Sequence, residues 1–230
     1  MKHVALLGGT FDPIHIGHLR MAVELRLAGF DEVRLIPNNV PPHREQPKAS
    51  AQQRLAMVQL ACESLAQQGV SGIIADDIEL KRDQPSYSVA TLEELKKQLP
   101  KNTALSWVIG DDAWESIHQW HRIDEFLGLA NLVIINRGHE NQFPYTTLQG
   151  QWLKQHATEL DNLLECTNGK LIRLNWRLLD VSATYLRSLL AQGKGAQLLT
   201  PDAVLKYIAE YQLYKFDWKR KRRLNATWRN

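Results

Sequence analysis

The sequence predicts an α/β protein built on a doubly wound parallel sheet. Three observations support this prediction. Short apolar runs alternate with helical patterns from one end of the chain to the other. The runs are predominantly apolar, as in strands that are buried on both faces. Several helical patterns end in Gly, a common helix stop. Strands and helices in alternation imply parallel strands joined by right-handed crossovers.

The elements follow in chain order. The expected strands are 3–7, 33–37, 72–75, 105–109, 132–135 and 171–174. The expected helices are 18–29, 51–69, 89–99, 183–193 and 201–214. In the last helix, Thr200 is the expected cap and Pro201 the first residue, while Val204, Ile208 and Tyr211 share a face that packs on the body. The stretch 138–168 is longer than one crossover needs and is interpreted as an insertion.

Length and composition favour a single globular domain over residues 1–214, followed by a basic tail over residues 215–230. The chain has 230 residues, of which 44% are hydrophobic and 23% charged. No apolar run approaches the ~20 residues of a membrane span, and the N-terminus enters a strand too soon for a secretory signal. Cys62 and Cys166 lie far apart in amphipathic segments. We therefore expect no disulfide framework and a cytoplasmic location.

The net charge of +3 is unevenly distributed. Residues 215–230 carry seven Lys and Arg side chains and one Asp, whereas the rest of the chain carries 21 basic and 24 acidic side chains. The body is therefore near neutral, and nucleic acid is not an expected partner except through the tail. The charge run 219–223 is most simply a solvated, mobile end. Composition leaves the oligomeric state open.

The loop 8-GGTFDPIHIGH-18 concentrates unusual residues directly after the first strand. Gly8 and Gly9 let the backbone turn sharply and approach a ligand. Gly17 leaves the amides at the helix start open to an anion. His15 and His18 are three residues apart, so their imidazoles face the same space. The arrangement suits a polyphosphate.

A zinc site made by Asp12, His15 and His18 is the alternative interpretation of this loop. The chain has no HExxH motif and no other His/Cys cluster at ligand spacing. The glycines and the helix start serve a phosphate, so we expect no metal held by the protein itself.

A second candidate phosphate site lies at 181-VSATYLR-187. Ser182 is a good N-cap, and the helix that follows offers free amides to an anion. Arg187 lies one turn from Thr184 on the same face, where its guanidinium can bind two phosphate oxygens. On its own, this pattern is more typical of a simple helix cap followed by a solvated arginine.

Together, the two segments resemble the paired signatures of the HxGH nucleotidyltransferase superfamily, and more narrowly those of bacterial nicotinate-mononucleotide adenylyltransferases. Val181 replaces the usual Ile, and the similarity runs from residue 1 to about 214. The resemblance implies a Rossmann-like nucleotidyltransferase fold, with ATP and Mg²⁺ as expected ligands and His18, His15 and Arg187 as catalytic residues. The ATP-binding residues that it implies are Gly8, Gly9, Thr10, Phe11, His15, Gly17, His18, Gly110, Asp112, Ser182, Thr184 and Arg187.

Four further segments, 37–44, 79–92, 109–114 and 118–122, resemble segments of the nicotinate-mononucleotide enzymes. On that resemblance Asp112 in 109–114 binds the nucleotide, and the other three segments belong to the acceptor site. The resemblance implies that backbone amides of 85–91 meet the nicotinate carboxylate and that Trp120 stacks on the pyridine ring. At position 121 the chain has His where the family often has Tyr. The mononucleotide-binding residues that it implies are Thr10, Asn39, His43, Tyr87, Ser88 and Trp120.

Other classes of protein share parts of this pattern. The sequence 15-HIGH-18 is also the first signature of class I aminoacyl-tRNA synthetases, but no Lys-Met-Ser-Lys-Ser-like loop follows, and 230 residues leave no room for a tRNA-reading domain. Phosphopantetheine adenylyltransferase shares the TFDP start but lacks the PPH and PSYS segments. A catalytically silent nucleotide sensor is a further alternative, which the intact His18 and Arg187 disfavour.

Overall fold

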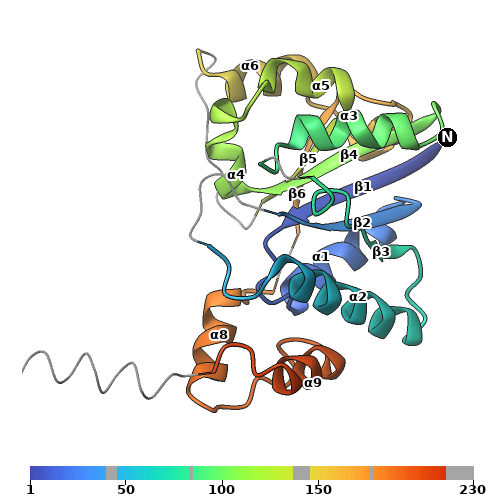
Figure 1. Cartoon of the computed structure of the whole chain (residues 1–230). Coiled ribbons are helices and arrows are strands. Elements are labelled where there is room, and N and C mark those ends of the chain that lie inside the picture. Colours follow the sequence, from blue (N-terminus) through green and yellow to red (C-terminus); the bar gives the residue numbers. More distant parts are fainter. Residues whose placement is uncertain (40–45, 83–84, 137–145, 177–178, 216–230) are drawn as a thin grey trace, which may run out of the picture.

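The six predicted strands form one parallel sheet in the computed structural model, which describes residues 1–39, 46–82, 85–136, 146–176 and 179–215 (Figure 1). The strand order is β3-β2-β1-β4-β5-β6. The strands are β1 Lys2–Gly9, β2 Glu32–Pro37, β3 Ile73–Ala75, β4 Thr103–Gly110, β5 Asn131–Asn136 and β6 Leu171–Asn175. All their pairings are parallel, so the predicted fold class is confirmed.

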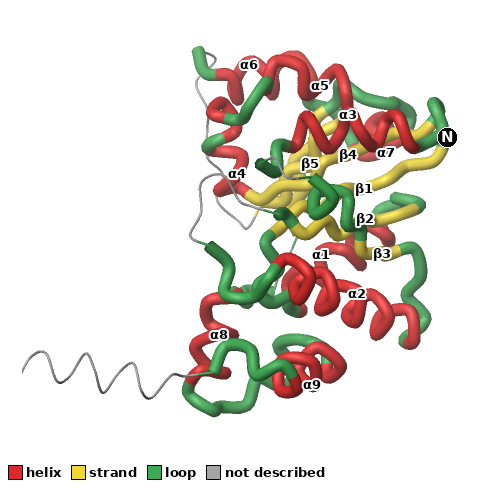
Figure 2. The backbone as a smooth tube through the Cα atoms, viewed as in Figure 1, coloured by secondary structure: helices red, strands yellow, loops and turns green. Residues whose placement is uncertain are grey.

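Helices cover both faces of the sheet, as Figure 2 shows. The helices that contribute side chains to the first core are α1 Ile16–Leu27, α2 Ala51–Gln67, α7 Leu160–Leu164 and α9 Asp202–Glu210. Those that contribute to the second core are α3 Ser88–Gln98, α4 Asp111–Glu115, η1 Ile117–Gln119, η2 Ile123–Glu125, α5 Phe126–Leu129 and α6 Leu148–His156. The remaining helix, α8 Ala183–Ala191, lies near the carboxyl end of the sheet (Figure 1).

Strand β1 shows why the sheet needs two cores. Ala5 and Leu7 belong to the first core, whereas Val4 and Leu6 belong to the second, and all four are at most 6% exposed. Successive strand residues point to opposite faces, so a strand buried on both faces is apolar without alternation. This explains the continuous apolar runs of the sequence.

The order of the strands reverses between β1 and β4, which run side by side in the middle of the sheet. After β1 the chain proceeds to β2 and β3 on one side of this pair, and after β4 it proceeds to β5 and β6 on the other side. Where strand order reverses in this way, ligands bind in a crevice beyond the carboxyl ends of the two central strands, here β1 and β4. The loop that follows Gly9 and the loop that follows Gly110 flank this crevice. Topology therefore selects these two loops, among six, as the place for a ligand.

Four predicted helices, at 18–29, 51–69, 89–99 and 183–193, are confirmed within a few residues at each end. The shorter helices between residues 111 and 164 were not predicted. The described part of 138–168 forms α6 and α7, whose Trp152 and Leu163 are buried in the second and first core, respectively. Residues 146–168 are therefore packed into the fold on both sides of the sheet.

The expected details of the last helix need correction. Pro201 is the N-cap of α9, and the Thr200 hydroxyl instead donates to the Ile14 carbonyl at 2.8 Å. The helix ends at Glu210, so Tyr211 is its C-cap and is 52% exposed, while Val204 and Ile208 are buried as predicted. No helix in the described ranges has the length and apolarity to cross a membrane.

Candidate active site

The loop after β1 is folded tightly around Phe11. This side chain is 2% exposed, and its backbone is left-handed, with a φ of 49°. A Cβ atom at Gly9 would lie 3.0 Å from the Phe11 ring, closer than side-chain carbons pack. Gly9 therefore leaves room for the ring to fold back under the loop.

His15 and His18 mark the start of α1. His15 is the N-cap, and the two imidazoles stack with their centroids 3.7 Å apart. The His15 amide donates to His18 Nδ1 at 3.4 Å. A neutral histidine whose Nδ1 accepts carries its proton on Nε2. The contact therefore favours a His18 that offers an Nε2–H donor beside the amides of the first helical turn.

The second predicted segment, 181–187, and the residues just before it pack against this loop. A Cβ atom at Gly17 would lie 3.2 Å from the Leu179 carbonyl oxygen and 3.1 Å from the His15 ring. Arg187 Nη1 donates to the Asp12 carbonyl oxygen at 2.7 Å across 175 residues of sequence. The two segments therefore meet at the carboxyl end of β1.

Helix α8 begins as predicted at the Ser182 cap. The Ser182 hydroxyl accepts from the Tyr185 amide at 3.2 Å. Arg187 Nη2 donates to Thr184 Oγ1 at 3.2 Å, so these two side chains share one face of the helix. The Arg187 side chain is 27% exposed, which leaves part of the guanidinium open to a ligand.

The Asp12 carboxylate is buried below this loop, with 4% of the residue exposed. Its Oδ2 accepts from the Lys48 amide at 2.8 Å, and its Oδ1 accepts from the Ala49 amide at 3.1 Å and from the Tyr214 hydroxyl at 2.7 Å. Arg187 Nη1 lies 3.9 Å from Oδ2. Asp12 thus joins the β1 loop to the start of α2, to α8 and to the chain beyond α9.

A buried arginine connects the β1 loop to the loop after β2. Arg54 is 1% exposed and donates to the backbone carbonyls of Thr10 at 2.7 Å, Asn38 at 2.8 Å and Asn39 at 3.2 Å. Burial lowers the pKa of Arg54, and the nearby Asp12 carboxylate opposes that shift. The guanidinium therefore fixes the spacing of two ligand-facing loops.

The loop after β2 is also tied to the segment before α3. The Asn39 amide donates to the Ser86 hydroxyl at 3.0 Å, and Asn39 Nδ2 donates to the Arg82 carbonyl at 2.8 Å. Both nitrogens of Asn39, the backbone amide and Nδ2, therefore already donate hydrogen bonds within the protein. The mutual position of these segments is set by hydrogen bonds that involve side chains.

Glu79 lies at the centre of that segment and is 3% exposed. Its carboxylate accepts from the Thr91 hydroxyl at 2.7 Å and hydrogen-bonds Ser86, while Arg82 Nη2 lies 3.9 Å away and also donates to the Thr91 oxygen. Burial raises the pKa of Glu79, and the bonds to Ser86 and Thr91 partly oppose this. Glu79 thus connects Thr91 near the start of α3 with Ser86, whose hydroxyl accepts from the Asn39 amide.

Helix α3 begins at Ser88, with Tyr87 as its N-cap and no capping side chain among the described residues. Its first amides therefore remain available to an anion. Tyr87 stacks on His121 with ring centroids 4.4 Å apart, and Trp120 contacts Phe126 edge-to-face at 6.1 Å. Aromatic rings thus lie near a helix start, as the predicted acceptor site requires.

Helix α4 follows β4 directly. Gly110 is its N-cap, and Asp112 lies exposed in its first turn, next to the crevice. The part of the chain that the structure describes contains no group of three or more His, Cys, Asp or Glu side chains placed to hold a metal ion. The zinc arrangement of Asp12, His15 and His18 is not formed, because Asp12 is engaged with Lys48, Ala49 and Tyr214.

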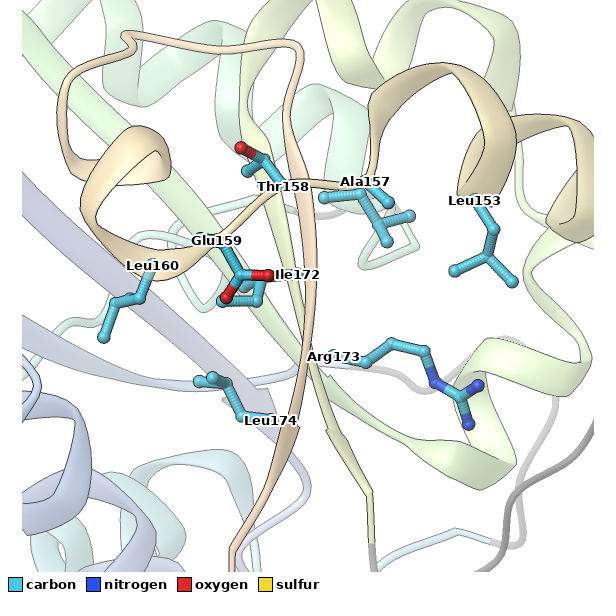
Figure 3. Close-up of a pocket in the computed structure, with 9 residues that line it drawn as sticks. Leu153, Ala157, Thr158, Glu159, Leu160, Ile172, Arg173 and Leu174 are labelled. Carbon is cyan, nitrogen blue, oxygen red and sulfur yellow. The ribbon is translucent and has the colours of Figure 1, made fainter.

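A cavity of about 280 Å³ lies along β6, the last strand at one edge of the sheet (Figure 3). Its lining includes Leu153 and Leu160, and Arg173 lies at its margin. None of the residues predicted for the site lines this cavity. The ligand site indicated by the topology, at the carboxyl ends of β1 and β4, therefore lies elsewhere on the sheet.

The structure brings most of the predicted residues to one region. Thr10 accepts from Asn38 Nδ2 at 3.4 Å, and its carbonyl is held by Arg54, so the two predicted halves of the site share this residue. His43 lies outside the described residues. Four residues that organise the region were not predicted from the sequence to do so. No role was predicted for Arg54, Glu79 or Tyr214, and the bonds of the Asp12 carboxylate to Lys48, Ala49 and Tyr214 were not predicted.

Fold and site together define the class of protein, and comparisons with known proteins identify the family. The cytidylyltransferase-like family model matches residues 6–188, so the chain belongs to that family. Curated relatives place it more narrowly among the nicotinate-nucleotide adenylyltransferases. A probable nicotinate-nucleotide adenylyltransferase of Pseudomonas putida (strain GB-1) is 42% identical over 94% of this chain and 96% of its own length. One of Pectobacterium atrosepticum is 40% identical over 92% and 98%.

Solved structures agree on the fold. The nicotinic acid mononucleotide adenylyltransferase of Plasmodium falciparum complexed with NaAD has a TM-score of 0.67 at 18% identity, and covers 94% of this chain and 99% of its own. The same enzyme complexed with APC has a TM-score of 0.64 with the same coverage. At this identity the likeness bears on the fold alone.

Proposed function

We propose that this chain transfers the adenylyl group of ATP to nicotinate mononucleotide, giving nicotinate adenine dinucleotide and pyrophosphate. The observation that carries the proposal is the contact between Arg187 and the Asp12 carbonyl. It ties the helix that carries Arg187 to the loop that carries His18 at the end of β1, which supports a shared site for a guanidinium, an imidazole and two helix starts. Such a set of donors is suited to a triphosphate.

The chemistry is a single displacement at the α-phosphorus of ATP. A phosphate oxygen of the mononucleotide forms the new P–O bond, and the bond between the α-phosphorus and the bridging oxygen of pyrophosphate breaks. Both reactants are anionic, so the protein contributes mainly positioning and neutralisation of charge. His18 Nε2–H and Arg187 supply donors to the α-phosphate and the leaving pyrophosphate, and His15 orients His18 through the stack.

The remaining predicted ATP residues surround these groups. Gly8, Gly9 and Gly17 keep the backbone open to the nucleotide, Ser182 and Thr184 present the start of α8, and Gly110 and Asp112 face it from the other side of the crevice. ATP enters as its Mg²⁺ complex, in which phosphates and water hold the ion. Mg²⁺ is thus part of the substrate.

The acceptor is recognised on the side of α3. We propose that the free amides around Ser88 receive the nicotinate carboxylate, and that Trp120 and Tyr87 contact the pyridine ring. Thr10, Asn39 and His43 are the further proposed contacts. Because Asn39 Nδ2 is bonded to the Arg82 carbonyl, the side chain would present its Oδ1 or exchange that bond on binding.

The sharpest test compares nicotinate mononucleotide with its amide. Backbone N–H groups satisfy a carboxylate, whereas an amide NH₂ would leave them without acceptors and forgo the attraction of the helix dipole. Sites that match polar groups in this way discriminate by several powers of ten, so we expect kcat/KM to favour the acid by on the order of 10³. Both values are measured at saturating Mg·ATP. Equal values, or a preference for the amide, would contradict the acceptor assignment and leave adenylyl transfer standing.

Several expectations lie beyond this site. We propose ATP and nicotinate mononucleotide as small-molecule partners and the cytoplasm as the location, consistent with two free cysteines. The division into a domain over 1–214 and a tail over 215–230 stays a prediction. Contact of the Tyr214 hydroxyl with Asp12 indicates that the packed body extends at least to Tyr214.

A further inference from the structure

The Asp12 carboxylate lies close to Arg187 but does not pair tightly with it. The shortest distance between the two charged groups is 3.9 Å, and Arg187 donates instead to the neutral Asp12 carbonyl at 2.7 Å. Tight arginine–carboxylate pairs have N–O distances of about 2.7–2.9 Å and are commonly bidentate. The guanidinium is thus anchored by an oxygen that does not neutralise it.

Other donors occupy the carboxylate. The Lys48 amide bonds Oδ2, while the Ala49 amide and the Tyr214 hydroxyl bond Oδ1. The two amides belong to the rigid approach to α2, where Ser50 caps the helix. Among the described residues, the Tyr214 hydroxyl is the donor that a side chain supplies to this carboxylate from a distant part of the sequence.

The conformation of the chain around Tyr214 suits this contact. Gln212 and Tyr214 have φ values of 53° and 59°, in the left-handed region that bulky residues rarely adopt. The turn brings the Tyr214 ring back against the first core and its hydroxyl to the buried carboxylate. Burial and the adjacent Asp12 charge raise the pKa of Tyr214, so its hydroxyl remains a donor at ordinary pH.

We infer that Tyr214 is a positioning residue: by holding the Asp12 carboxylate away from Arg187, it keeps the guanidinium charge available to the phosphates of the bound nucleotide. The inference rests on the proposed function, in which Arg187 binds those phosphates. Without the hydroxyl, Oδ1 loses a donor and the carboxylate can turn toward the positive charge nearest to it. Asp12 then competes with the nucleotide for Arg187.

The test compares Tyr214→Phe with Tyr211→Phe in the full chain. Each variant loses one hydroxyl from the same part of the sequence, but Tyr211 is exposed. We expect the Kd of a non-hydrolysable ATP analogue, measured by calorimetry, to rise about tenfold in Tyr214→Phe and to stay within twofold in Tyr211→Phe. The KM for nicotinate mononucleotide should not change in either variant. An unchanged Kd in Tyr214→Phe, or an equal rise in Kd and in the acceptor KM, would overturn the inference.

A double-mutant cycle with Arg187→Ala separates positioning from a loss of structure. If Tyr214 acts through Arg187, removing its hydroxyl in the Arg187→Ala background leaves the Kd where Arg187→Ala alone puts it. A further tenfold rise in that background would mean that the hydroxyl acts by another route. Thermal unfolding of each variant verifies that the folded chain is being titrated.

Failure of this inference is distinguishable from failure of the proposed function. The binding experiment contains no acceptor, so it reports on Tyr214 even if nicotinate mononucleotide is not the substrate. Conversely, normal transfer to nicotinate mononucleotide with an unchanged Kd in Tyr214→Phe would reject the role of Tyr214 and retain the reaction.

Discussion

The two halves of the site are built in different ways. The proposed donor half, formed by the β1–α1 loop and α8, is assembled by close packing at Gly9 and Gly17 and by Arg187 on the Asp12 carbonyl. The proposed acceptor half, formed by residues 38–39, 79–82, 85–91 and 120–121, is assembled by side-chain hydrogen bonds around Glu79 and by the stack of Tyr87 on His121.

This difference follows from what each half must do. The proposed donor half must hold charge at a reacting phosphorus, where small displacements are costly. Its loop is therefore anchored at several points, which include close packing at Gly17 and the bond of Arg187 to the Asp12 carbonyl. The acceptor half must recognise a ring and a carboxylate, which side chains and a free helix start can do. Changes in the donor half should therefore affect turnover, and changes in the acceptor half should affect acceptor binding.

The largest expected effect is at His18. His18→Ala removes a donor proposed to act on the α-phosphate and should lower kcat by about 10²–10³-fold. His156→Ala is a matched control, since His156 bonds the Gly169 carbonyl at the end of α6 and lies outside the donor half. Steady-state assays of both variants, with thermal melts, make the comparison. A folded His18→Ala chain with near-normal kcat would remove His18 from the mechanism.

A smaller effect is expected at Gly17, where the donor half depends on close approach. Gly17→Ala crowds the Leu179 carbonyl, at a cost of about 1–3 kcal/mol for overpacking that is offset by up to about 1 kcal/mol of helix propensity. We expect a net loss of stability of about 1 kcal/mol and, because α8 moves with Leu179, a fall in kcat of about 10–100-fold. Denaturant titration and initial rates measure the two quantities.

Gly128→Ala provides the control for this substitution, because a Cβ atom there meets nothing within 4 Å. This variant should be as stable and as active as the unmodified chain. If Gly17→Ala behaved in the same way, close approach at Gly17 would not be what joins the two segments.

The smallest effect is expected in the acceptor half. Glu79→Gln weakens the bonds to Thr91 and Ser86, at about 1 kcal/mol for one bond, and should raise the acceptor KM about 3–10-fold while leaving the Kd of the ATP analogue unchanged. Initial rates with varied acceptor measure this change. A rise in the Kd of the ATP analogue would mean that the two halves are not independent.

The pH dependence of stability provides a second readout at Glu79. Burial raises the pKa of this carboxyl in the folded chain, so its contribution to stability is present below the unfolded pKa and is lost as pH rises through the folded pKa. The unfolding midpoint of the unmodified chain should therefore fall relative to that of Glu79→Gln as pH rises from about 4.5 through the folded pKa. A constant difference between the two melts would contradict this sign.

Much of this architecture could be predicted from the sequence because it depends on local patterns. Each strand centres on a predominantly apolar run, and the predicted phosphate loops carry glycines and caps at fixed spacing. The short helices α4 to α7 could not be predicted, because they are stabilised mainly by packing of residues such as Trp114 and Trp152 against the sheet. The error at Thr200 has a similar origin, since its hydroxyl is used in a tertiary contact with Ile14.

The missed polar residues differ in how visible they were. Arg54 shares a helix face with Met57, Val58 and Ala61, all buried, so an arginine on an apolar face was a signal that could have been used. Glu79 and Tyr214 carry no comparable pattern. Their partners lie 12 and 202 residues away and are set by the tertiary fold alone.

The buried Arg54 has one more consequence. A histidine or lysine in the same place could lose its proton in an ordinary range of pH, and the loops that it holds would then part. A guanidinium keeps its charge at every pH at which proteins function. The three bonds that Arg54 donates to the carbonyls of Thr10, Asn38 and Asn39 therefore make the spacing between these two loops insensitive to a rise in pH.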